Sequence, residues 1–145
     1  MKKIFLLLAI FTTTQINAQL FTDLGVGAAY QVNEMPKNYL PMFKLSVGYE
    51  FYNILIEAIE QVAISRQANS PNYFGLKAGY NFNGFVPSAG YLYNYSNSDN
   101  PENNGWYPGV ALKYQFQVND NGGLYVEGLY INKSAMLTAG IHYQF

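Results

Sequence analysis

The 145-residue sequence contains no cysteine, which excludes a disulfide framework and a thiolate metal site. Charged residues are scarce as well: they make up 12% of the chain, whereas soluble domains average about 25%. Eight Lys and Arg stand against nine Asp and Glu, so no basic stripe exists that could neutralise phosphates, and nucleic acid is not an expected partner. A water-soluble domain of this composition would have difficulty covering its surface with polar groups.

Long apolar runs are also missing, apart from one over residues 4–11. This run is too short to cross a bilayer as a helix, which needs about 20 residues. Two lysines precede it and a polar stretch ending in Ala18 follows it, which predicts a secretory signal peptide over residues 1–18. The mature chain, residues 19–145, is then one domain with six basic and nine acidic residues, a net charge of −3. If the mature chain lies in a membrane, strands must cross it.

The mature chain does contain alternating apolar and polar side chains, in eight stretches of about the 9–11 residues that a tilted transmembrane strand requires. These stretches lie at 24–32, 42–51, 54–65, 73–82, 85–95, 106–118, 123–131 and 135–145. Tight turns rich in Asn and Gly are predicted at 52–53, 83–84 and 119–122, and longer polar loops at 33–41, 66–72 and 96–105, with 132–134 a short exception. Short turns at one end and long loops at the other predict an all-β fold: an eight-stranded antiparallel up-and-down transmembrane β-barrel with both termini in the periplasm.

The two faces of each predicted strand differ in composition. In the last strand, Leu137, Ala139 and Ile141 share one face, whereas Thr138 and His142 lie on the other. The polar face is mostly Gly, Ala, Ser and Gln, which suits a narrow lumen, so we expect the apolar face to contact lipid. Aromatic residues near strand ends predict two interfacial girdles. The expected members are Phe51, Tyr52, Tyr80, Phe82, Phe85, Phe116 and Phe145 at the turn end, and Tyr30, Tyr73, Tyr95, Trp106, Tyr107 and Tyr130 at the loop end.

Six charged residues are predicted to face the lumen: Lys44, Glu50, Glu57, Lys77, Lys113 and Glu127. Because buried charges need partners, we expect an internal ion-pair network that plugs the barrel, with Lys77 pairing with Glu57 and Lys113 with Glu127. A selectivity filter is the alternative, but an eight-stranded barrel is only wide enough for its own side chains.

Glu60 does not fit this pattern, because the face that carries Glu57 inward turns Glu60 toward lipid. A charge at the bilayer midplane costs up to a few kcal/mol. Three explanations stay open: Glu60 lies near the loop-side interface, a β-bulge re-aims its side chain, or it contacts another subunit.

The final strand ends in Ile141-His142-Tyr143-Gln144-Phe145, with a terminal aromatic residue. With the architecture above, this resembles the small outer-membrane β-barrels of the OmpA and OmpX type, in the compact form common in Bacteroidota. The resemblance implies that the barrel-assembly machinery reads Ile141, Tyr143 and Phe145, that the protein lies in the bacterial outer membrane, and that membrane lipid surrounds it. No peptidoglycan-binding domain follows the barrel, so that function is not implied.

The expected function is a non-enzymatic structural, adhesive or surface-interaction role, with the three long loops 33–41, 66–72 and 96–105 as sites for a surface partner. No catalytic residue, cofactor or metal site is predicted. The loop at 99–105 offers oxygen ligands without the spacing of a calcium loop. One alternative is a secreted or periplasmic soluble barrel with reversed faces that binds a small apolar ligand inside. Another is a lipid A-modifying enzyme, but such enzymes use a His near the outer rim, whereas His142 lies near the periplasmic end.

Overall fold

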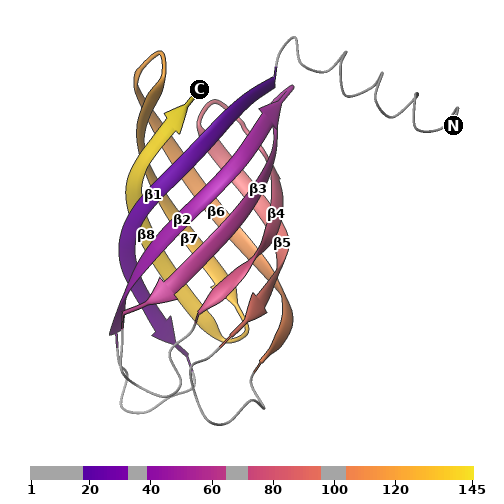
Figure 1. Cartoon of the computed structure of the whole chain (residues 1–145), viewed down its shortest axis with the longest axis vertical. Helices are drawn as coiled ribbons and strands as arrows, with labels where there is room; N and C mark the ends of the chain where they lie inside the picture. Colours follow the sequence, from indigo (N-terminus) through magenta and orange to yellow (C-terminus); the bar gives the residue numbers. More distant parts are fainter. Residues whose placement is uncertain (1–17, 33–38, 65–71, 96–103) are drawn as a thin grey trace, which may run out of the picture.

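A computed structural model describes residues 18–32, 39–64, 72–95 and 104–145, which form eight strands in one closed antiparallel barrel. Each strand pairs with its neighbours in sequence, and the first pairs with the last (Figure 1). The strands are β1 (Ala18–Gln31), β2 (Tyr39–Phe51), β3 (Ile54–Ala63), β4 (Tyr73–Tyr80), β5 (Phe85–Asn94), β6 (Gly105–Asn119), β7 (Gly122–Ile131) and β8 (Ser134–Gln144). The predicted up-and-down barrel is confirmed. No helix in the described part of the chain is long and apolar enough to cross a bilayer.

β1 begins six residues earlier than the sequence pattern predicted, at Ala18. It pairs with β2 from Ala18 to Tyr30, and its side chains keep alternating between the two faces before Leu24, with Leu20 exposed and Phe21 buried. Asp23 therefore lies inside a strand and points into the barrel. The predicted signal peptide otherwise falls outside the described residues and stays a prediction. Most residues of the three long loops also fall outside the described residues.

Tight turns close one end of the barrel. Tyr52 and Asn53 have φ angles of 48° and 65°, and Asn83 and Gly84 have 53° and 93°. Positive φ at both central residues is the geometry of two-residue hairpins whose twist matches that of the strands. The start of β1 and the C-terminus lie at this same end, which we call the turn end, and the opposite end is the loop end (Figure 1).

Apolar side chains cover the outside of the barrel, as the sequence predicted. Leu24, Val110 and Ile141 are each 57–60% exposed. The polar side chains that alternate with them, such as Asp23 and His142, point inward and are buried. Apolar layers fill the lumen at both ends. The loop-side layer contains Ala29, Leu40, Met42, Ile59, Ala63, Tyr73, Leu92, Ala111, Leu129, Ile131 and Met136; the turn-side layer contains Phe21, Leu55 and Val86. The soluble alternative, which needs the apolar face inside, is not what this chain forms.

Two predicted girdle residues do not lie on the outside. Tyr73 is fully buried in the loop-side layer, and Tyr107 packs against that layer. Their neighbours Phe74 and Trp106 point outward instead. Successive side chains in a strand alternate between faces, so nearness to a strand end alone does not place a residue in the girdle.

Candidate functional site

Three lysines and three carboxylates meet in the middle of the lumen, between the two apolar layers. Each comes from a different strand, and each is at most 3% exposed. We call this group the charge cluster: Asp23, Lys44, Glu57, Lys77, Lys113 and Glu127. Its three positive and three negative side chains give a formal net charge of zero.

Glu57 is the centre of the cluster, because its carboxylate contacts all three lysines. Its oxygens lie 3.1 Å from the Nζ of Lys44, 3.3 Å from that of Lys77 and 3.0 Å from that of Lys113. Each lysine in turn contacts at least two carboxylates. Buried charges of this kind are tolerated only when each is paired and hydrogen-bonded, and the cluster meets that condition.

Glu127 and Asp23 complete the cluster. Glu127 accepts hydrogen bonds from Lys44 at 2.9 Å and from Lys77 at 2.5 Å. Asp23 accepts one from Lys113 at 2.7 Å and lies 3.5 Å from the Nζ of Lys44. The six side chains therefore form one connected network rather than separate pairs.

The sequence-based pairing needs two corrections. Lys113 and Glu127 are opposite each other in the register of β6 and β7, yet the Lys113 ammonium crosses the lumen to Asp23 and Glu57. Glu50 does not join the cluster: it is half-buried at the turn end and accepts a hydrogen bond from Asn81 at 3.0 Å. Extending the alternation of β1 backward from Leu24 would have placed Asp23 in the lumen.

Aromatic rings line the cluster and fill the space beside it. The Nζ of Lys44 lies 4.6 Å from the centroid of the Tyr125 ring, and that of Lys113 lies 5.1 Å from the Phe21 ring. Such contacts stabilise a desolvated cation through the electron-rich ring face. Charges and rings thus pack together in the lumen between the two apolar layers.

His142 connects the cluster to the turn end. Its Nδ1 lies 2.7 Å from Asp23 Oδ1 and donates a hydrogen bond to that carboxylate. The Gln115 side chain lies 3.4 Å from the same nitrogen, and the Phe21 ring lies 5.2 Å from the imidazole ring. His142 is thus a lumen residue held by a carboxylate.

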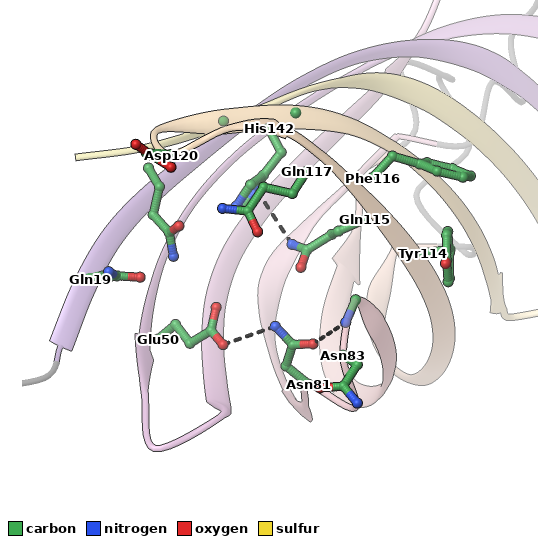
Figure 2. A pocket seen from close by; sticks show the side chains of 14 residues that line it. Gln19, Glu50, Asn81, Asn83, Tyr114, Gln115, Phe116, Gln117, Asp120 and His142 are labelled. Atoms are coloured by element: carbon green, nitrogen blue, oxygen red, sulfur yellow. Dashed lines mark hydrogen bonds between the residues drawn. The ribbon is translucent and has the colours of Figure 1, made fainter.

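A polar cavity of about 620 Å³ opens at the turn end. Figure 2 shows His142, Glu50, Asn81 and Gln115 around it, with Asn81 bonded to Glu50. The full lining is Gln19, Glu50, Asn81, Asn83, Gly84, Tyr114, Gln115, Phe116, Gln117, Asp120, Gly122, Gly123, His142 and Gln144. Six of these are carboxamides, and His142 links the polar cavity to Asp23 of the charge cluster.

Within the described ranges, no group of three or more His, Asp and Glu side chains is placed to hold a metal ion. The carboxylates of the cluster contact lysines instead. The predicted 99–105 loop falls mainly outside the described residues.

Solved structures of outer-membrane barrels resemble this one over almost their full length. Neisserial surface protein A is 15% identical (TM-score 0.61; 89% of this chain and 99% of that chain). The N-terminal β-barrel domain of Pseudomonas aeruginosa OprF is 17% identical (0.62; 89% and 98%). Ail of Yersinia pestis is 13% identical (0.56; 90% and 100%). The chain has the fold of the small outer-membrane β-barrels. No family model and no curated protein matches its sequence.

The last strand of this outer-membrane barrel fold presents its aromatic end outward. Ile141, Tyr143 and Phe145 are exposed, and the rings of Tyr143 and Phe145 lie 4.9 Å apart. The Phe145 N–H donates to the Leu20 carbonyl at 2.9 Å, so the chain is paired up to its last residue. Recognition of these residues by the barrel-assembly machinery stays a prediction.

Glu60 lies on the outer surface, and the bulge explanation is wrong. The register of β3 runs without interruption against β2 and β4, with Glu60 opposite Leu45 and Phe74. Its Oε1 accepts a hydrogen bond from the Tyr95 hydroxyl at 2.9 Å. Tyr95 directly follows β5, so Glu60 lies toward the loop end rather than at the middle of the barrel.

Proposed function

We propose that the chain is an integral protein of the bacterial outer membrane with its turn end and both termini in the periplasm. The outward apolar belt supports this location, because side chains such as Val110 and Ile141 would be costly to leave in water. The outward aromatic residues Phe85 and Phe145 at the turn end, and Trp106 toward the loop end, suit the two membrane interfaces.

The charge cluster carries the second part of the proposal: the barrel is closed, and it serves a structural, adhesive or surface-interaction role rather than as a general pore. The Nζ of Lys44 alone contacts carboxylates from β1, β3 and β7, so the network spans the lumen from wall to wall. An ion would have to break several of these contacts and pass the loop-side apolar layer.

Surface interaction falls to the three long loops, 33–41, 66–72 and 96–105. They connect strands at the end opposite the termini, which in the proposed orientation is the cell exterior. Ail, which shares the fold, was solved in complex with the heparin analogue sucrose octasulfate. A barrel of this size therefore offers enough surface for a specific ligand, and loops on a rigid scaffold are where such binding evolves.

The lipid A-modifying alternative has no observation in its favour. His142 lies at the turn end and is held by Asp23, whereas those enzymes place their His near the outer rim. Expression of the chain is expected to leave lipid A unchanged, as judged by mass spectrometry of the extracted lipid.

Fractionation of cells that express the full-length chain tests the proposed location. We expect the protein in the outer-membrane fraction, and we expect its band to shift between unheated and boiled samples on a gel. A soluble periplasmic protein without a heat shift would overturn the proposal.

Planar-bilayer recording with the purified protein tests the closed lumen. We expect no steady conductance from the native protein. Steady open channels would show that the cluster does not plug the barrel.

A further inference from the structure

Glu60 stands apart from the other charged residues of the barrel wall. Among the charged side chains that the structure describes within its eight strands, it alone is exposed on the outer face. An ionisable group on a membrane-facing surface is expensive, and such residues mark functional sites with a specific partner. The hydrogen bond from Tyr95 uses one oxygen of the carboxylate, Oε1, which leaves the group able to bind a second donor.

An aromatic patch lies on one side of Glu60. We use this name for Phe74, Tyr93, Tyr95 and Trp106. Phe74, the cross-strand neighbour of Glu60, has its ring 5.4 Å from Tyr93, 5.7 Å from Tyr95 and 5.8 Å from Trp106. A carboxylate beside several aromatic rings is the chemistry that recognises an ammonium group, through an ion pair and cation–π contacts together.

An apolar groove of about 640 Å³ lies on the other side, and Glu60 is one of its lining residues. Its walls come from β1, β2, β3 and β8, with Leu24, Phe43 and Ile141 among the exposed side chains. The small Ala139 faces Val26 across the β1–β8 pair and keeps the groove open. Its volume is in the range of ligand-sized pockets.

We propose that Glu60, the aromatic patch and the groove form one binding site for an amphiphile that has an ammonium headgroup and an acyl chain. The ammonium group pairs with Glu60 beside Phe74, and the acyl chain lies in the groove toward Ala139. Charge complementarity selects this occupant. Lys44 also lines the groove, but its ammonium group is buried in the lumen, so Glu60 provides the exposed charge of the site and that charge is negative. The inference rests on the proposed location of the barrel in a membrane.

Native mass spectrometry of the purified barrel in detergent tests the site. The protein is mixed with equal amounts of phosphatidylethanolamine, phosphatidylcholine and phosphatidylglycerol. Each retained lipid is then identified from the mass that it adds to the protein. We expect a roughly tenfold preference for phosphatidylethanolamine over phosphatidylglycerol, as one charge-assisted hydrogen bond would give. Phosphatidylcholine keeps the positive charge and the cation–π contact but has no N–H to donate to the carboxylate, so its retention is expected between the two. Equal retention of all three lipids would overturn the proposal.

Two variants separate the headgroup contact from the groove. Glu60→Gln keeps the size of the side chain and removes its charge, so the lipid preference should disappear while overall retention changes little. Ala139→Leu fills the groove and should lower retention of all three lipids. The matched controls are Asp120→Asn, which removes a charge at the turn end, and Ala78→Leu, which enlarges another exposed alanine away from the groove. A control that changes retention as much as its partner variant would contradict the site.

Each sample is first checked for the heat shift on a gel. A sample without the shift would count against the membrane barrel itself, whereas a shifted sample without lipid preference would count only against this site. A dimer that persists without lipid and is lost in Glu60→Gln would show that a second copy of the chain, not an amphiphile, occupies the surface.

Discussion

Glu57 and Glu60 are three residues apart on the same strand, yet the two carboxylates lie in opposite environments. Glu57 is buried among three lysine ammonium groups in the lumen, whereas Glu60 is exposed on the outer face beside a single tyrosine hydroxyl. Successive residues of a strand face opposite sides of the barrel wall, so a step of three residues moves a side chain from the buried ionic interior to the outer face. The inner carboxylate, Glu57, is thus part of a network that connects several strands. The outer carboxylate, Glu60, is exposed and can bind a ligand from outside the chain.

The largest expected effect comes from removing the inner carboxylate. Glu57→Ala leaves three buried lysines with only two carboxylates, and an unpaired buried charge costs about 3–5 kcal/mol of unfolding free energy. Urea unfolding of the barrel in vesicles, followed by the fluorescence of Trp106, measures this. A loss of less than about 1 kcal/mol would mean that the cluster is hydrated like a surface ion pair.

A double-mutant cycle asks whether the inner charges act as a network. Lys77→Met and Glu127→Leu each leave the cluster with one uncompensated buried charge, whereas the double variant removes one charge of each sign. We expect the double variant to be more stable than the sum of the single losses predicts, by about 1.5–3 kcal/mol. The same unfolding assay measures the coupling energy. Additive losses would show that the 2.5 Å contact between Lys77 and Glu127 contributes no coupling energy.

The two faces also differ in how tightly they are packed. A Cβ added at the inward-facing Gly48 would overlap the ring of the buried Phe21. Gly48→Ala should therefore cost about 1–3 kcal/mol through overpacking. Ala58→Val, which adds volume to the exposed outer face of β3, should change stability by less than about 0.5 kcal/mol. Equal losses at the two positions would contradict a filled lumen.

Period-two alternation was sufficient to predict the eight strands, their inner and outer faces, and the placement of five of the six cluster residues. Asp23 was missed because the first strand was started at residue 24, where its strongest apolar positions begin. Contacts across the lumen, such as Lys113 with Asp23, could not be predicted, because strand register relates neighbouring strands and says nothing of how long side chains extend across the barrel.

The bond between Glu60 and Tyr95 was beyond prediction for a different reason: Tyr95 follows a strand, where periodicity no longer gives the direction of a side chain. The alternation of side chains along β3 could only predict that Glu60 points outward. Its partner depends on how the chain leaves β5, and that is decided by packing at the loop end, where the Tyr95 ring meets Phe74.

The smallest expected effect comes from removing the outer charge. Glu60→Gln should change the unfolding free energy by less than about 0.5 kcal/mol, since an exposed hydrogen bond contributes little. Its effect should instead be seen at Tyr95. Burial, together with the hydrogen bond to Glu60 and its negative charge, raises the pKa of Tyr95 to about 12 from 10.0. Loss of the Glu60 charge should lower this pKa toward the value that burial alone maintains.

The raised pKa also gives a sign to the pH dependence. The phenol of Tyr95 holds its proton more tightly in the folded than in the unfolded chain. The contribution of this proton to the stability of the folded chain is therefore fully present below pH 10, and it is lost as the pH rises through about 12. Titration of the tyrosine Cζ resonances by NMR, with Tyr95→Phe to assign the signal, measures the pKa in the native chain and in Glu60→Gln. An unchanged pKa would mean that Glu60 does not hold Tyr95, and the outer carboxylate would then lack the one partner that distinguishes it from a solvated side chain.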